Sequence, residues 1–239
     1  MKDIILSVVD SPDGESPELF PDVMVKLSKK HIPVKFLQIA DLGCGKGTIS
    51  VALAKEFDCK ITGIDAMPDF IDSAKEYALR ENVSEKCRFF TGDIRTEILL
   101  LSGFDLVILG AIGNVLGNVG ETLLKLRKIL SPDGFILLDD AWSKQIEISK
   151  DSAFPTTTEY FSMIADAGSK VVEMDVAEMT DHSGQEKIMM DSMQKRCDEL
   201  TLKHPQLKQI FKHYIQNQQH EFNMVKFELN CATLLLKRI

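Results

Sequence analysis

The chain has 239 residues, of which 44% are hydrophobic and 27% charged, and its formal net charge at pH 7 is -8. This composition is typical of a globular protein with one substantial hydrophobic core, and it excludes a fibrous or disordered class. The acidic balance disfavours non-specific binding to nucleic acid, because phosphates carry the same sign of charge.

The cysteines and the first residues indicate the compartment. The five cysteines are widely spaced and form no CxxC pair, so neither a disulfide framework nor a zinc knuckle is expected. Residues 1–9 hold only a short apolar run, which predicts no signal peptide and no membrane span. We therefore expect a cytoplasmic protein without a membrane partner.

Residues 1–35 are predicted to form an N-terminal cover. Residues 10–18 are rich in turn formers, and a helix is expected from near Ser16-Pro17 to about Lys30, with Ser as N-cap and Pro in the first turn. Two interpretations of this helix stay open: a plain cover, or a lid over a ligand.

Residues 36–54 predict a strand, a tight turn and a helix. The turn holds Gly43, Gly45 and Gly47 on alternate positions. Glycines permit positive φ and let a ligand approach the backbone closely, and the following helix presents free N–H groups. This pattern indicates a nucleotide-type site.

The next elements alternate between strands and helices. Strands are expected at 60–65, 87–93, 104–110 and 135–140, a helix begins at Pro68, another runs through Leu123 to Leu130, and Ser131–Gly134 is a predicted turn. Such alternation predicts a doubly wound, Rossmann-like α/β sheet of parallel strands. Ligands bind such sheets at the carboxyl ends of the strands.

The last hundred residues are less regular. We expect a helix at 158–167 ending at Gly168, a strand at 170–176, helices at 184–203 and 205–222 broken at His204-Pro205, and a final strand at 227–236. We interpret residues 1–239 as a single domain, with a helical insert or lid at 181–224 between its last two strands.

Three residues indicate which nucleotide the site takes. Thr48 stands where a dinucleotide fingerprint needs its third glycine. Asp65 ends the next strand, where a carboxylate can accept both ribose hydroxyls, and Asp93 is placed to meet an adenine edge. The pattern favours an adenosine cofactor without a pyrophosphate.

Five motifs in order resemble the class I S-adenosylmethionine-dependent methyltransferases. They are Ala40-Asp-Leu-Gly-Cys-Gly-Lys-Gly47, Thr62-Gly-Ile-Asp65, Gly92-Asp-Ile94, Phe104-Asp-Leu-Val107 and Leu130-Ser-Pro-Asp-Gly-Phe135. Together they cover a cofactor-binding core at 36–142. Within the superfamily the chain is most similar to the UbiE-like and "methyltransferase type 11" small-molecule enzymes.

The resemblance implies a fold and a set of cofactor contacts. The fold is a seven-stranded sheet of order 3-2-1-4-5-7-6 with the last strand antiparallel. The implied contacts are Gly43 and Gly45 with the methionine part, Cys44 and Gly47 within the same loop, Asp41 with the loop or the amino group, Asp65 with the ribose, Ala66, Met67, Asp93 and Ile94 with the adenine, and Leu109 and Gly110 along the methyl-transfer channel.

The implied activity is methyl transfer from S-adenosyl-L-methionine to a small molecule, chiefly by orientation in a closed pocket. No dedicated catalytic residue is required; His182 is a weak candidate for a general base. No metal is expected, since Ala111-Ile-Gly-Asn114 supplies no acid after the fourth strand. Of Asp139 and Asp140, one is expected to line the cofactor pocket or orient a loop.

Two alternatives stay open. The chain could bind S-adenosylmethionine without turnover, since every binding motif would serve that role. An NAD-dependent oxidoreductase is the less favoured alternative, because of Thr48. Nucleic-acid substrates are disfavoured, since Leu109-Gly-Ala-Ile-Gly113 lacks the Asn/Asp-Pro-Pro-aromatic sequence of amino-methylating nucleic-acid enzymes.

Overall fold

A computed structural model describes residues 21–33, 36–145, 154–177 and 183–239. The chain divides into two compact units. One unit holds Leu19–Val176 together with Cys231–Ile239, and the other includes Ala177–Asn230. The predicted helix start near Ser16-Pro17 lies outside the described residues.

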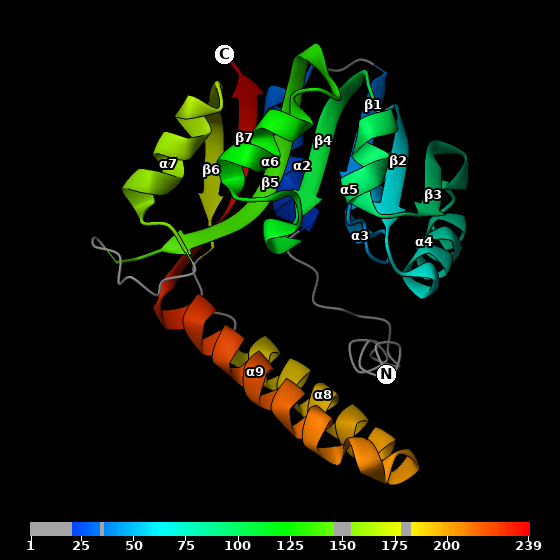
Figure 1. The fold of residues 1–239 in the computed structure, drawn as a ribbon. Coiled ribbons are helices and arrows are strands. Elements are labelled where there is room, and N and C mark those ends of the chain that lie inside the picture. The colour runs from blue at the N-terminus through cyan, green and yellow to red at the C-terminus, as the bar shows by residue number, and fades with distance from the viewer. Residues whose placement is uncertain (1–20, 34–35, 146–153, 178–182) are drawn as a thin grey trace. The chain divides into compact units, whose positions relative to one another are not determined.

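The first unit is built on a single sheet (Figure 1). Its described strands are β1 (Leu37–Leu42), β2 (Cys59–Asp65), β3 (Cys87–Thr91), β4 (Phe104–Gly110), β5 (Leu130–Ser143), β6 (Ser169–Val176) and β7 (Leu229–Arg238). They lie in the order β3-β2-β1-β4-β5-β7-β6. The pairs among β1 to β5 are parallel, whereas β6 and β7 pair antiparallel. The predicted fold class and strand order are confirmed.

Helices cover both faces of this sheet (Figure 1). One face carries α2 (Pro21–His31), α3 (Thr48–Glu56) and α4 (Pro68–Arg80), and the other carries α5 (Ile94–Glu97), α6 (Val119–Leu126) and α7 (Thr157–Asp166). Short 3-10 turns lie at Ser84–Lys86, Ile98–Leu100 and Gly113–Leu116. Successive strand residues serve opposite faces: Leu106 packs with the first set and Val107 with the second. This two-sided burial explains why the strands are apolar throughout.

Two boundaries differ from the predicted ones. Strand β5 begins at Leu130, within the expected helix, and includes the predicted turn at 131–134. A turn within the strand is possible because Leu130 pairs with Phe104 and Phe135 pairs with Leu106. The residues between Leu130 and Phe135 therefore bulge out of the ladder. Helix α9 runs to Phe227, and the last strand starts two residues later than expected.

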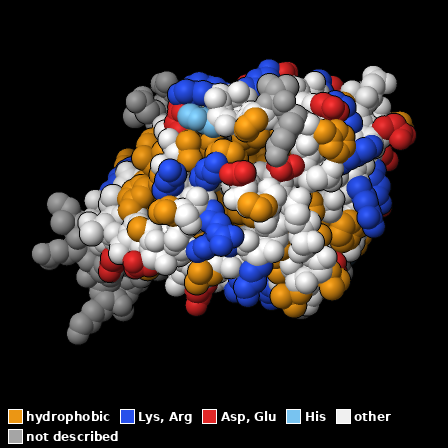
Figure 2. Space-filling view, turned by 90° about the horizontal axis from the view of Figure 1, so that it is seen from above, with side chains coloured by type: hydrophobic (Ala, Val, Ile, Leu, Met, Phe, Trp, Pro, Cys, Tyr) orange, Lys and Arg blue, Asp and Glu red, His pale blue; other side chains and the backbone are white. Residues whose placement is uncertain are grey.

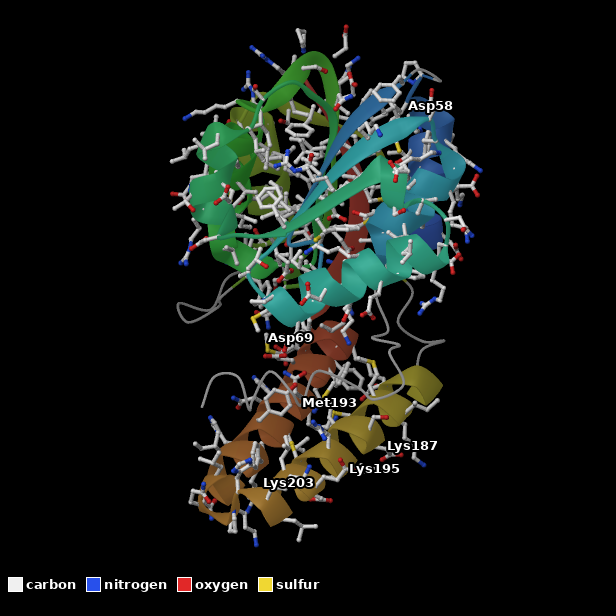
Figure 3. All side chains as sticks on the ribbon, turned by 90° about the vertical axis from the view of Figure 1, so that its right-hand side faces the viewer. Asp58, Asp69, Lys187, Met193, Lys195 and Lys203 are labelled. Atoms are coloured by element: carbon white, nitrogen blue, oxygen red, sulfur yellow. The ribbon has the colours of Figure 1, made fainter. Side chains whose placement is uncertain are left out.

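The second unit contains the insert between β6 and β7. Helices α8 (Ser183–Lys203) and α9 (Lys208–Phe227) are joined through the 3-10 turn Pro205–Leu207, so the predicted break at His204-Pro205 is confirmed. Cys197, Leu200 and Phe211 form a small core of their own. Figure 3 shows Lys187, Lys195 and Lys203 on α8, and all three are exposed.

None of the described helices combines the length and the apolarity needed to cross a membrane. The assignment of residues 1–239 to a single domain, with a cover at 1–35, a core at 36–142 and a lid at 181–224, stays a prediction.

Candidate functional site

The glycine loop, residues 43–47, joins β1 to α3. Gly43, Gly45 and Gly47 all have positive φ, at 79°, 53° and 83°. A Cβ on Gly47 would lie 2.9 Å from the Cβ of Ala74 and 3.1 Å from Phe89. Both the turn and the close approach of α4 therefore require glycine at this position.

Backbone hydrogen bonds fix the glycine loop against β2. The N–H groups of Gly43 and Cys44 both donate to the carbonyl of Ile64, at 2.8 and 3.0 Å. Cys44 is buried. The loop is thus held in place by the strand that ends in Asp65.

Asp65 lies at the carboxyl end of β2 and faces the glycine loop. Its Oδ2 accepts the Gly45 N–H at 3.0 Å, and its Oδ1 accepts the Met67 N–H at 2.8 Å. Each carboxylate oxygen has a second lone pair, so the side chain can still accept a further hydrogen bond on each side. Asp69, in the first turn of α4, lies at this end of the sheet, whereas Asp58 lies at the opposite end (Figure 3).

Asp41 is buried at the end of β1. Its Oδ2 accepts a hydrogen bond of 2.6 Å from the Ser50 hydroxyl on α3. The side chain is 1% exposed. Of its two predicted roles, this contact fits the orienting of the loop, since it ties the strand to the helix on the far side of the turn.

Asp93 caps α5 and is paired with Arg95. The Arg95 guanidinium donates to both carboxylate oxygens, and its backbone N–H donates to Oδ1 at 2.9 Å. These hydrogen bonds lower the pKa of Asp93 to about 2. An adenine amino group would therefore meet an ionised carboxylate that already has a strong partner. Ile94 is buried in the core, and Ala66 is exposed.

The segment after β4 lies close to the glycine loop. A Cβ on Gly43 would lie 2.4 Å from Cγ2 of Ile112. Leu109 is buried under this segment, and Gly110 is partly exposed. The structure thus brings the predicted channel residues beside the predicted cofactor loop.

Ala111 has a left-handed backbone, with φ of 48°. This conformation costs a non-glycine residue about 1–2 kcal/mol. We expect Ala111→Gly to raise the free energy of unfolding by about 0.5–1 kcal/mol, since glycine also gives back some entropy to the unfolded chain. The matched variant Ala52→Gly, inside α3, should instead lower it by about 1 kcal/mol. Urea unfolding measures both; equal losses would show that Ala111 is unstrained.

The ends of β4 and β5 border a small cavity of about 20 Å³, room for one water-sized group. Its described lining residues are Leu109, Ile112, Gly113, Asn114, Gly117, Val119, Thr122, Leu138, Asp139 and Asp140. The lining holds two carboxylates, and no Lys or Arg of the described chain takes part in it.

The two acids have different surroundings. Asp140 accepts the Tyr160 hydroxyl at 2.8 Å and the Ala141 N–H at 2.8 Å. Asp139 Oδ1 accepts a long hydrogen bond from Thr233, whereas its Oδ2 is buried without a partner among the described residues. Burial raises the pKa of both acids, that of Asp139 to about 6. The sequence predicted that one of these two acids lines the cofactor pocket or orients a loop; that role stays a prediction, and both acids border this cavity.

Trp142 and Tyr160 are packed and not exposed. Their rings stack at 4.7 Å between centroids, with Phe161 against both edges. Both rings are buried in the core, and the Tyr160 hydroxyl holds the Asp140 carboxylate from that side.

His182 lies outside the described residues. Among the residues that the structure describes, no group of three or more His, Cys, Asp or Glu side chains could hold a metal ion.

A larger hollow of about 380 Å³ lies at the opposite end of the sheet. It is lined by His31, Phe135, Lys170, Val171, Val172 and Lys237. Figure 2 shows this face, where cationic, anionic and apolar side chains alternate. Because ligands of open α/β sheets bind at the carboxyl ends of strands, we place the site at the smaller cavity and the glycine loop.

Comparison with known proteins identifies the family. A family model described as "Methyltransferase domain" matches residues 34–219, well over half of the chain. The chain belongs to this methyltransferase family. The predicted resemblance to the class I methyltransferases is thereby confirmed.

Individual curated relatives match over shorter stretches. The release factor glutamine methyltransferase of Salmonella typhimurium is 28% identical over 167 residues, covering 56% of this chain and 57% of the relative. The ubiquinone biosynthesis O-methyltransferase of Rickettsia akari is 33% identical over 102 residues, covering 43% and 39%. The chain spans about half or less of the length of these relatives, so they do not establish its substrate.

Solved structures match the whole chain. A SAM-dependent methyltransferase from Geobacter sulfurreducens, in complex with S-adenosyl-L-homocysteine, has a TM-score of 0.80 at 19% identity and covers 100% of this chain and 99% of its own. A similar complex from Thiobacillus denitrificans has a TM-score of 0.81 at 19% identity, with 98% of each chain covered. At such identities the likeness shows the fold.

Proposed function

We propose that this methyltransferase family member transfers the methyl group of S-adenosyl-L-methionine to a small-molecule acceptor. The observation that carries the proposal is the pairing of Asp65 with the backbone N–H of Gly45. It sets the carboxylate that we propose to bind the ribose directly against a glycine loop, which a ligand can approach closely. The family assignment supports the same function.

The residues present fit that cofactor. Asp65 would hold the ribose through the free lone pairs of its carboxylate, and Asp93 with Ala66, Met67 and Ile94 would surround the adenine. The glycine loop with Cys44 would carry the methionine part, and Leu109 with Gly110 would border the methyl. Asp41, tied to Ser50, would keep the loop in place. These assignments stay predictions.

The bound cofactor supplies a methyl group already activated by a positively charged sulfur. The protein then has to orient the acceptor and exclude water, and orientation alone can contribute about 7–11 kcal/mol in the best cases. The buried surroundings of Leu109 and the apolar side chain of Ile112 suit the exclusion of water. We propose that the acceptor is a small molecule and that the protein acts in the cytoplasm. We also propose that it has no nucleic-acid or membrane partner.

Calorimetry with S-adenosyl-L-homocysteine and with NADH tests the cofactor. We expect binding of the first and none of the second, because Thr48 stands where a dinucleotide site needs glycine. The opposite result would favour an oxidoreductase. Transfer of an isotope-labelled methyl group to a metabolite panel then tests turnover. Binding without any transfer would favour a cofactor-binding protein.

A further inference from the structure

We propose that the cavity between the ends of β4 and β5 receives an amino group of the acceptor, held by Asp139. This inference rests on the proposed function and adds the class of acceptor: an amine. The cavity, with a volume of about 20 Å³, has room for an amino or hydroxyl group.

The lining favours a cation or a hydrogen-bond donor. Asp139 and Asp140 both border the cavity, and its described lining includes no Lys or Arg that would offset their charge. Asp140 already has two donors, the Tyr160 hydroxyl and the Ala141 N–H. Asp139 Oδ2 has none among the described residues, although it is shielded from solvent. A buried carboxylate oxygen without a donor is unfavourable until a ligand supplies one.

The cavity lies beside the proposed cofactor loop. Ile112 lines it and also contacts the glycine loop at Gly43. The strained residue Ala111 connects this segment to β4, and its N–H donates to the carbonyl of Asp139 at 3.3 Å. Backbone strain of this kind clusters at functional sites. Ile112 therefore borders both the cavity and the proposed methionine-binding loop, so the two places adjoin.

The transfer step balances with Asp139 as proton acceptor. The ammonium group of the acceptor gives one proton to the Asp139 carboxylate and becomes a neutral amine. The nitrogen lone pair then forms a bond to the methyl carbon while the carbon–sulfur bond breaks, and sulfur keeps that electron pair. The proton leaves Asp139 for solvent when the methylated product departs. The raised pKa of about 6 makes Asp139 a better base than an exposed aspartate.

The groups around Asp139 permit this role. The titratable side chains that interact with it are Asp140 on the same strand, Tyr160 on α7 and Cys231 on β7. Burial raises the pKa of both the Tyr160 hydroxyl and the Cys231 thiol, so both are neutral at pH 7. Asp140 carries a like charge, which adds to the attraction for a cation.

Thermal unfolding with S-adenosyl-L-homocysteine bound tests the inference without a known acceptor. The probes are n-butylamine and n-butanol, which differ only in the terminal group. We expect the amine to raise Tm of the wild-type complex near pH 8 and the alcohol to leave it unchanged. Asp139→Asn should remove the amine shift while S-adenosyl-L-homocysteine still binds, whereas Asp133→Asn, an exposed control, should retain the shift.

A pH comparison sharpens the test. The Asp139 carboxylate gains its proton as the pH falls through about 6, while the amine stays charged. The amine shift should therefore vanish near pH 5 in the wild type. An equal shift with the alcohol, no amine shift, or an amine shift that survives Asp139→Asn would each overturn the inference. Failure of S-adenosyl-L-homocysteine to bind the wild type would instead contradict the proposed function itself.

Discussion

Replacing Asp65 by Asn is expected to weaken the binding of S-adenosyl-L-homocysteine by about 10- to 150-fold for each ribose hydrogen bond that is lost. Hydrogen bonds to charged groups contribute about 1.5–3 kcal/mol each, and every 1.4 kcal/mol is tenfold in affinity. The substitution removes the charge, and it turns a donor NH2 toward the N–H of either Gly45 or Met67. Isothermal titration calorimetry measures the dissociation constants of S-adenosyl-L-homocysteine for the wild type and for Asp65→Asn.

Two further aspartates serve as matched controls for this substitution. Asp69 lies at the same end of the sheet and Asp58 at the opposite end (Figure 3), and both are exposed. Asp69→Asn and Asp58→Asn remove one charge each without touching the glycine loop, so each should change the affinity less than about threefold. An unchanged affinity in Asp65→Asn would show that Asp65 only orients the loop and does not hold the ribose.

Removal of the Tyr160 ring is expected to have the largest effect on stability. Tyr160 is 1% exposed, stacks on Trp142 and donates its hydroxyl to Asp140. Tyr160→Ala should lower the free energy of unfolding by about 3–5 kcal/mol, because it leaves a cavity among packed rings. Tyr160→Phe should lower it by about 1–3 kcal/mol, because Asp140 loses a donor in a buried place.

The decrease in the free energy of unfolding caused by Tyr160→Phe should depend on pH. Burial raises the pKa of Asp140, and the Tyr160 hydrogen bond lowers it. Without the hydroxyl, the ionised Asp140 is less well stabilised, so the loss is present at neutral pH. It should fade as the pH falls through the raised pKa and Asp140 gains a proton. The fluorescence of Trp142, the single tryptophan of the chain, follows unfolding at this place. Tyr77→Phe, on the half-buried ring of α4, should change little at any pH.

Much of the fold could be predicted because local and long-range signals agree. The alternate glycines need positive φ, and the strands are apolar on both faces because helices cover both. The boundaries near Leu130 and Phe227 could not be placed, since they depend on pairing across the sheet and not on local sequence.

The site was predictable at its strand ends and not in its side-chain pairings. Asp65 ends β2 as expected, because parallel strands bring their carboxyl ends to one edge of the sheet, and Asp41 is the last residue but one of β1. The pairing of Asp93 with Arg95 depends on side-chain rotamers. The lack of a partner for Asp139 Oδ2 among the described residues depends on neighbours from other strands. No spacing rule in the sequence carries that information.

The antiparallel pairing of β6 with β7 has an evolutionary consequence. Val176 pairs with Ala232, and antiparallel neighbours can be joined by a turn of two residues. The chain instead places α8 and α9 between them, with a small core of their own. The strand pair can therefore accept inserts of very different length without a change in its register. Evolution can replace the helices between β6 and β7 without changing the glycine loop or Asp65.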